Sequence, residues 1–312
     1  MLMRAPPLPF PVPALQAAPG YAAALTLLGV DVMTFDMAAG GAVVGRAQVV
    51  MRRLPVLGRV AWLPLGPQWH DGTDTNAQAE ALARLARRLP TTGARLWIST
   101  ARDAMGDAGF ARAGHIPLLA GRAEARLDLT QGLAALRRGM GGKWRNALVR
   151  AEASVAAGAM RLQDAPLPVD PAHWLLRLEA AQRRARGYSA WPTALTLAYA
   201  RANPGDARIF WAEHQGNPIA GLVILRHGAG ATYHLGWTGP DGRRMAAHQV
   251  LIWQAVCWLC ARGGTRLDLG QIDPDRAPGL MRFKLGTGAS ATRHGRTWLH
   301  QPHLTALWGR LP

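Results

Sequence analysis

Two lysines are the first residues whose type points to chemistry. Lys143 and Lys284 are the only lysines among 36 lysine and arginine residues. In a chain where arginine serves almost everywhere, we expect lysine where the forked guanidinium does not fit, for example beside a bound anion. Lys143, Asn146 and Arg150 share one face of a predicted helix and would line a basic groove. The alternative is that both lysines are surface residues without a role.

One carboxylate and one histidine in predicted strands are candidates for proton transfer. Asp268 stands between Leu267 and Leu269, and an isolated buried charge is costly, so it must face a strand end or a partner. It would act as a general base, position a substrate amine, or form a structural ion pair with an arginine. We expect His234 to titrate near neutrality, and it alternates with Tyr233, so only one of the two faces the core. The alternative for His234 is a half-buried residue without catalytic function.

The spacing of cysteines and histidines predicts no metal site. Cys257 and Cys260 lie late in an apolar helix, whereas a redox pair needs an exposed helix N-terminus. No second cysteine pair completes a zinc site, and His300 and His303 lack acidic or cysteine neighbours. We therefore expect both cysteines to pack in the core, without a disulfide framework.

The elements that must position these residues follow the same order twice. The first half contains three strand-like runs at 31–37, 42–54 and 59–63. An amphipathic helix at 76–89 and a further strand at 95–99 follow. The second half contains three strands at 208–214, 218–226 and 231–237. An apolar helix at 246–261 and a further strand at 266–269 follow. This order predicts an α+β fold duplicated in tandem, with mixed, mostly antiparallel sheets flanked by helices.

A chain of 312 residues is long enough for about two domains. We predict a proline-rich arm at 1–18, a first domain at 19–125 and a second domain with the active site at 126–312. A helical insertion is expected within the second domain at 171–202. We expect the second domain to open with one helix over 133–155. We expect it to close with one strand over 291–299.

Composition and charge narrow the class of protein. A hydrophobic content of 49% with 12 Trp excludes a disordered chain, and no apolar run reaches the roughly 18–20 residues of a membrane span. We expect a cytoplasmic protein, with contact to a membrane surface left open. The net charge of +17 reflects either a solvated, arginine-rich surface or an anionic partner such as tRNA, a nucleotide-linked substrate, coenzyme A or a lipid head group.

Three segments stand in an order and spacing that point to a known family. The first is GRAQVV at 45–50 with GPQW at 66–69. The second is KWRNAL at 143–148. The third is DLG at 268–270, followed by GL at 279–280, FK at 283–284 and G at 288. In that order they resemble the first domain, the helix opening the second domain, and the closing signature of the FemABX branch of the GNAT acyltransferase superfamily. The resemblance spans about residues 19–300.

The resemblance implies an N-acyltransferase with no tightly bound cofactor. Such an enzyme moves an acetyl or other acyl group from acyl-CoA, or an aminoacyl group from tRNA, to an amine acceptor. Members of the branch carry a helical hairpin arm, and only modest helices over 171–201 are expected here. The pyrophosphate loop of CoA-dependent members, Gln/Arg-x-x-Gly-x-Gly/Ala, is degenerate, because RRMAAH at 243–248 lacks both glycines. Both donors therefore stay open.

The resemblance also assigns roles to particular residues. The expected donor-binding residues are Gly236, Trp237, Thr238, Arg243 and Arg244, near the separated fourth strand and a phosphate-attracting helix N-terminus. The expected catalytic residues are Asp268, Lys284 and His234, with Lys284 near the anionic substrate or the developing charge. The expected acceptor or anion groove contains Lys143, Asn146, Arg150, Tyr233 and Phe283. The alternatives are a catalytically inactive GNAT-fold protein that binds tRNA or another anion, and a membrane-surface enzyme acting on a lipid-linked amine.

Overall fold

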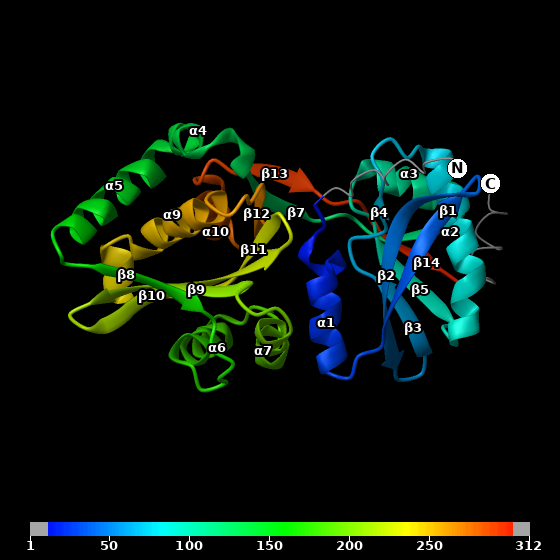
Figure 1. Ribbon diagram of the computed structural model, residues 1–312, viewed down its shortest axis with the longest axis horizontal. Coiled ribbons are helices and arrows are strands. Elements are labelled where there is room, and N and C mark those ends of the chain that lie inside the picture. The colour runs from blue at the N-terminus through cyan, green and yellow to red at the C-terminus, as the bar shows by residue number, and fades with distance from the viewer. Residues whose placement is uncertain (1–11, 302–312) are drawn as a thin grey trace, which may run out of the picture. The chain divides into compact units, whose positions relative to one another are not determined.

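The computed structural model describes residues 12–301, which divide into two compact units (Figure 1). Among the described residues, the first unit comprises 12–22, 29–122 and 293–301, and the second comprises 23–28 and 123–292. Most of the expected proline-rich arm, residues 1–11, lies outside the described residues. The division at 122/123 lies close to the expected boundary after 125. The chain beyond 292 falls with the first unit and not with the second, because strand β14 (Thr297–His300) pairs within the first sheet.

The first unit is built on one seven-stranded sheet. Its other strands are β1 (Val32–Ala39), β2 (Ala42–Leu54), β3 (Gly58–Leu63), β4 (Gln68–Trp69), β5 (Leu96–Thr100) and β6 (Ile116–Leu119). The helices along this part of the chain are η1 (Leu15–Ala17), α1 (Pro19–Leu27), α2 (Thr75–Arg88), η2 (Leu89–Thr92) and α3 (Ala104–Arg112). The strand order is β1-β2-β3-β5-β14-β6, with β4 beside β2, and the β3–β5 pair is parallel.

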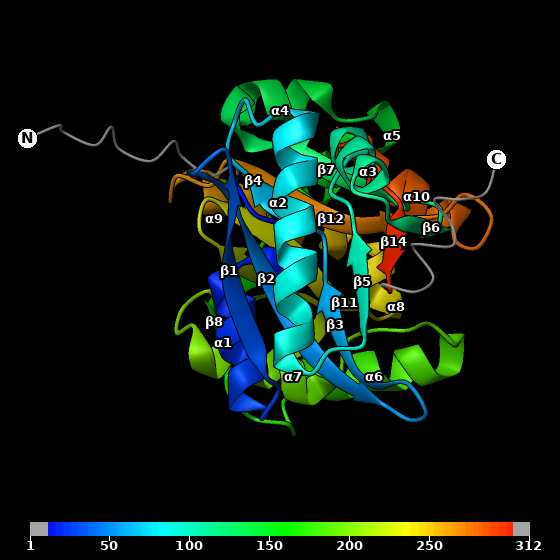
Figure 2. The same cartoon turned by 90° about the vertical axis from the view of Figure 1, so that its right-hand side faces the viewer.

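Helix α2 shows how the sequence sets an element in this unit. The Asp74 carboxylate caps its N-terminus by accepting a hydrogen bond from the Ala77 amide at 2.8 Å. Leu82 and Leu85 lie one turn apart on its apolar face and are buried with the sheet residues. Figure 2 shows α2 running along one face of the sheet formed by β1, β2, β3 and β5. The helix predicted at 76–89 is confirmed.

The second unit is built on a second seven-stranded sheet. Its strands are β7 (Ala123–Asp128), β8 (Arg161–Pro166), β9 (Ala207–His214), β10 (Asn217–His227), β11 (Gly230–Thr238), β12 (Arg266–Ile272) and β13 (Ser290–Arg293). Its helices are η3 (Leu129–Gln131), α4 (Leu133–Gly139), α5 (Gly142–Ala156), α6 (Trp174–Arg186), α7 (Thr193–Ala202), α8 (Pro240–Arg244), α9 (Ala247–Cys260) and α10 (Pro278–Leu285). The strand order is β13-β7-β12-β11-β10-β9-β8.

The two sheets repeat one topology. In each, three consecutive antiparallel strands are followed by a helical connection and a strand parallel to the third: β1-β2-β3-α2-β5 in the first and β9-β10-β11-α8-α9-β12 in the second. The strand beyond the parallel one is antiparallel in both units, β14 beside β5 and β7 beside β12. The predicted tandem α+β fold with mixed, mostly antiparallel sheets is therefore confirmed.

Helices α6 and α7 occupy the expected insertion over 171–202, where they connect the neighbouring strands β8 and β9. Two sequence expectations differ from the structure in the second unit. The helix expected over 133–155 is interrupted at Met140, whose extended backbone separates α4 from α5 in a glycine-rich stretch. The strand expected over 291–299 consists of two strands, β13 and β14, which belong to different sheets.

Helix α9 forms the centre of the second core. Its residues Leu251 and Ala255 are fully buried, in one cluster with Leu222 of β10 and Leu267 of β12. The expectation of a buried apolar helix is confirmed. Cys257 and Cys260 are half-buried and unlinked at its C-terminal end, where burial raises the pKa of both thiols. Among the helices within 12–301, none is both long and apolar enough to cross a membrane.

Candidate active site

The second sheet opens between its two parallel strands. β11 and β12 pair only from Gly230↔Arg266 to Thr232↔Asp268, although β11 continues to Thr238 and β12 to Ile272. In the described chain, residues 233–238 therefore pair with β10 alone, and we call them the open edge of β11. Backbone N–H and C=O groups that lose a ladder partner are available to a ligand. The separation of these strands, expected from the family resemblance, is confirmed.

A glycine with a left-handed backbone closely follows the last β11–β12 pair. The pairing of β12 with β7 shifts register between Asp268 and Gly270, and Gly270 has φ +80°, in the left-handed region that side chains disfavour. β11 is also irregular, since its pairing with β10 skips His234 between Tyr233 and Leu235. Two bulges next to each other bend these strands away from a regular parallel ladder, at the point where the sequence shows Asp-Leu-Gly.

Three hydroxyl and imidazole groups form a hydrogen-bonded chain along the open edge. The Tyr233 hydroxyl lies 3.0 Å from Nε2 of His248, and Nδ1 of His248 lies 2.9 Å from the Thr238 hydroxyl. Burial lowers the pKa of His248 to about 4, so the ring is neutral at neutral pH. A neutral imidazole donates at one nitrogen and accepts at the other, which allows a proton to be passed along the chain.

Gly236 lies beneath these rings, where only glycine fits. A Cβ atom there would stand 2.1 Å from the Tyr233 hydroxyl and 2.7 Å from Cε1 of His248. Its carbonyl accepts a hydrogen bond from the Gln182 side chain at 3.3 Å. The predicted donor-binding residues Gly236 and Thr238 and the predicted groove residue Tyr233 therefore meet around one histidine.

Helix α10 places a buried cation against β12. The Lys284 ammonium donates to the Gln271 carbonyl at 2.8 Å, and its side chain is 8% exposed. Burial lowers the pKa of Lys284 to about 8, while the Glu124 carboxylate acts in the opposite direction. The preceding residue, Phe283, lies with its ring centre 5.8 Å from that of His248. α10 thus links the hydrogen-bonded chain of β11 to the diverging part of β12.

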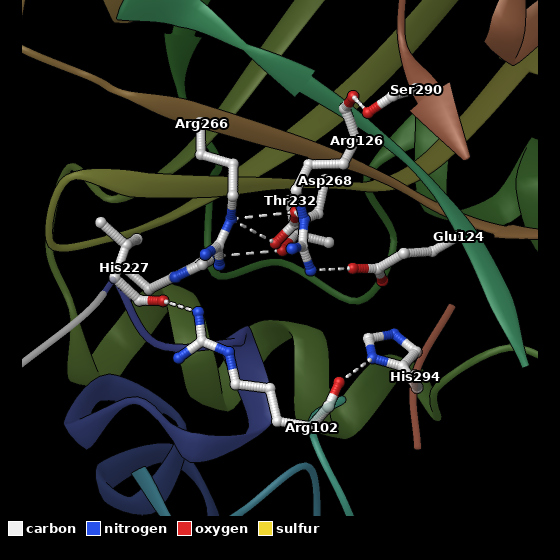
Figure 3. A network of polar contacts seen from close by, with 10 residues as sticks. Arg102, Glu124, Arg126, His227, Thr232, Arg266, Asp268, Ser290 and His294 are labelled. Atoms are coloured by element: carbon white, nitrogen blue, oxygen red, sulfur yellow. Dashed lines mark hydrogen bonds and ion pairs between the residues drawn. The ribbon is translucent and has the colours of Figure 1, made fainter. Parts of the chain in front are cut away.

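Asp268 occupies the last pair before the strands separate, and arginines surround it (Figure 3). Its carboxylate accepts hydrogen bonds from Nε of Arg126 at 3.1 Å and from Nε of Arg266 at 3.2 Å. Arg126 also pairs with Glu124. Burial raises the pKa of Asp268, against the effect of the two guanidiniums. Of the roles weighed from the sequence, this geometry matches the structural ion pair.

His234 and Trp237 face the helices that follow β8. His234 is half-buried, and its Nε2 lies 2.7 Å from the Thr196 hydroxyl of α7. Burial lowers the pKa of His234 to about 4, so the expectation that it titrates near neutrality is wrong. The Trp237 ring meets Trp174 of α6 edge to face, with centres 6.2 Å apart. In the described structure neither side chain forms a hydrogen bond or ring contact with Tyr233, His248 or Thr238.

The two candidate phosphate-binding arginines follow the open edge. Arg243 and Arg244 are the last residues of α8, and the longer helix α9 begins three residues later at Ala247. Arg243 donates to the Thr238 carbonyl at 2.6 Å, and the exposed Arg244 pairs with Asp241 at 2.7 Å. The residue between the helices, Ala246, has φ +53°. It adopts the left-handed conformation at the place where the degenerate pyrophosphate loop would have its first glycine.

The predicted basic groove lies on a different surface. Lys143, Asn146 and Arg150 are exposed on α5, and in the described chain their side chains form no hydrogen bond with residues of the open edge. The buried face of α5 carries Trp144, whose ring lies 6.2 Å from that of Phe283. The structure therefore joins Phe283 to the site and leaves the other three residues on the solvent side of their helix.

Several polar residues at the open edge were missed from the sequence. His248 was visible as a polar residue in the first turn of an otherwise apolar helix. Glu179 lies one turn beyond Leu175 and Leu176, so it falls on the apolar face of α6, and it is 5% exposed. Tyr188 and Gln182 contact each other near it, with 3.2 Å between hydroxyl and amide. No group of three or more metal-ligating side chains occurs in residues 12–301.

Comparison with known proteins agrees with this geometry. Residues 134–285 match the family model of the acetyltransferase (GNAT) domain. No match is found among curated proteins. Among solved structures, FemX aligns with 96% of this chain and 95% of its own, at a TM-score of 0.78 and 12% identity. L-PGS from Bacillus licheniformis aligns with 94% of this chain and 96% of its own, at a TM-score of 0.54 and 13% identity. A tandem GNAT protein from the clavulanic acid biosynthesis pathway aligns with 94% of this chain and 90% of its own, at a TM-score of 0.54 and 15% identity. Residues 134–285 therefore match a GNAT domain, and the chain has the fold of FemX and of tandem GNAT proteins.

Proposed function

We propose that the second unit transfers an acyl group to an amine at the open edge of β11. The observation that carries this proposal is the end of the β11–β12 ladder at Thr232↔Asp268, which leaves backbone groups of 233–238 without a strand partner on that side. Acyl transfer develops negative charge on the carbonyl oxygen, and preorganised N–H donors in a water-poor site stabilise it. The described part of the first unit has no equivalent, because β3 ends at Leu63, where its ladder with β5 ends.

The donor is an acyl-CoA, with acetyl-CoA as the simplest case, or an aminoacyl-tRNA. The left-handed Ala246 supports acyl-CoA, since a loop that keeps the glycine conformation without glycine keeps its backbone path. A tandem GNAT relative is itself described with reference to AcCoA. Arg243 and Arg244 stand before α9 and would pair with phosphates of either donor. Aminoacyl-tRNA is the second candidate donor, and the experiments must distinguish it from acyl-CoA.

The other residues of the site have separate roles in the proposed transfer. Lys284 supplies a positive charge beside the diverging part of β12, and Phe283 packs against the neutral His248. Tyr233, His248 and Thr238 provide a route for the proton that the amine must lose. Asp268 acts as a positioning residue, because its oxygens are engaged by Arg126 and Arg266 at the point where the strands part.

The proposal is tested by offering the purified protein acetyl-CoA, longer acyl-CoAs and charged tRNA in a thermal-shift panel. A donor that binds only the folded state raises the melting temperature. Consumption of that donor is then followed with a panel of primary amines, for the wild type and for Lys284→Met. We expect one donor class to bind and to be consumed only by the wild type. Full activity of the variant would refute the assignment of Lys284.

A second function, binding of an anionic partner without catalysis, is favoured by the charge of +17. Contacts between arginines and phosphates release counterions, so the affinity for tRNA would fall steeply with salt. A protein of this kind would bind tRNA and consume neither donor with any amine. The salt dependence and the turnover assay together distinguish the two functions.

A further inference from the structure

Two acidic residues are buried in the described chain, and they differ sharply in their partners. Glu179 and Asp268 are each 5% exposed. Asp268 is held by two guanidiniums. Glu179 accepts one hydrogen bond, from the Tyr188 hydroxyl at 3.0 Å, and within residues 12–301 no Lys, Arg or His nitrogen lies within 4.0 Å of its carboxylate. In a protein with a net charge of +17, a buried carboxylate without a cation calls for an explanation.

The contacts around Glu179 connect it to the open edge of β11. Gln182, one turn further along α6, donates both to the Tyr188 hydroxyl at 3.2 Å and to the Gly236 carbonyl at 3.3 Å. Glu179 also lies close enough to Tyr233 to contribute, after burial, to the raised pKa of that phenol. The carboxylate therefore stands beside the residues that surround Gly236, and its hydrogen-bond donor Tyr188 is 38% exposed.

The free-energy cost of burying the Glu179 carboxylate without a cation indicates which kind of group would bind there. A buried carboxylate loses its hydration, and one neutral hydrogen bond recovers only part of that loss. A primary ammonium offers a full positive charge and three N–H donors on a compact group. The acceptor of an N-acyltransferase arrives in this form at neutral pH. An uncharged alcohol of the same size offers neither the charge nor the additional donors.

We propose that Glu179, with Tyr188 and Gln182, forms the binding site for the ammonium group of the acceptor. The substrate class is thus a primary alkylamine that is protonated in solution. Tyr188 holds one carboxylate oxygen, and the other receives the ammonium. Gln182 fixes the Tyr188 hydroxyl relative to Gly236, so the bound nitrogen lies next to the open edge. The inference rests on the proposed acyl transfer for its biological meaning, but the cation site can be measured without any donor.

The experiment compares binding of n-butylammonium chloride and n-butanol at matched ionic strength, by calorimetry and thermal shift, without donor. We expect the wild type to bind the ammonium and not the alcohol. Glu179→Gln should bind the ammonium at least about tenfold more weakly, since a hydrogen bond to a charged group contributes at least that much. It should also melt at a higher temperature when no amine is present, because an unpaired buried charge has been removed. Glu80→Gln is the matched control, an exposed glutamate of the first unit paired with Arg84.

Equal binding of alcohol and ammonium by the wild type would overturn the inference, whether or not the variant folds. Undiminished ammonium binding by Glu179→Gln would overturn it as well. If the ammonium binds through Glu179 while no donor is bound or consumed, the cation site stands and the proposed acyl transfer fails. If amines are acylated by Glu179→Gln with an unchanged KM, the transfer stands and the assignment of Glu179 fails.

Discussion

Replacing Lys284 by methionine should make the protein more stable and less active. Burial moves the pKa of Lys284 from its ordinary 10.5 to about 8, and at 1.36 kcal/mol per pKa unit its charge costs about 3 kcal/mol at about pH 7. Methionine has a similar length and no charge, but it forfeits the hydrogen bond to Gln271, which costs about 1–2 kcal/mol. We expect a net stabilisation of about 1–2 kcal/mol at about pH 7.

The pH dependence of stability separates this effect from ordinary repacking. Because the pKa of Lys284 is lower in the folded than in the unfolded state, the unfolded chain binds more protons between about pH 8 and 10.5. Stability therefore rises with pH across this window. Relative to Lys284→Met, the wild type should regain about 2 kcal/mol between about pH 7 and pH 9.5. Groups common to both proteins cancel in this difference.

Urea denaturation of both proteins at the two pH values gives this difference directly. Lys143→Met is the matched control, because Lys143 is exposed on α5 and its loss should change stability by less than about 0.5 kcal/mol. Transfer by Lys284→Met, measured as kcat with the donor found above, should fall by about 10²–10³-fold if its charge stabilises the oxyanion. A variant that is less stable than the wild type at both pH values and fully active would show that Lys284 is a structural residue, and the reasoning would be refuted.

Three further substitutions test the geometry of the site. Ala246→Gly should raise the unfolding free energy by up to about 1 kcal/mol in urea denaturation, because glycine adopts φ +53° without strain; a loss of stability would contradict it. Gly236→Ala should leave the melting temperature within a few degrees but lower kcat by about 10²-fold, since its Cβ displaces the rings of Tyr233 and His248; an active variant would remove this chain from the mechanism. Asp268→Asn should cost about 3–5 kcal/mol in urea denaturation, because the buried Arg266 and the half-buried Arg126 lose their shared carboxylate; a change below about 1 kcal/mol would show that the pairing is not structural.

The fold was largely predictable because its pattern is local and occurs twice. Alternating strands, an amphipathic helix with a capping aspartate and an apolar central helix each follow from spacing along the chain. The errors arose where pairing is non-local. β8 is polar and half-buried, and it becomes a strand only through its ladder with β9. The division of 291–299 between two sheets depends on β5, β6 and β7, which are distant in sequence.

The site was predictable in part, and the reason lies in what sequence spacing encodes. Tyr233, Gly236 and Thr238 lie on one strand, so their common environment follows from one element. The partner His248 comes from α9 and faces them through tertiary packing, which periodicity does not reveal. The burial of Glu179 was indicated by its place on the apolar face of α6, but charged neighbours concealed it. An ion pair was among the roles weighed for Asp268, and its partner Arg266 stands two residues away on the same strand, but Arg126 comes from β7, which is distant in sequence.

Within residues 12–301, a local difference between the two copies accompanies the open edge of the second unit. In the first unit, Ser99 is the β5 residue paired with the last residue of β3, Leu63, and its buried hydroxyl donates to the Gly66 carbonyl at 3.2 Å. This contact ties the chain beyond β3 to β5. In the second unit the last paired residue of β12 is Asp268, which turns to arginines, and Gly270 then bends the strand. At equivalent positions the first copy thus has a serine hydroxyl bound to the chain beyond β3, whereas the second has a paired carboxylate followed by glycine, and the proposed acyl transfer is assigned to the second copy.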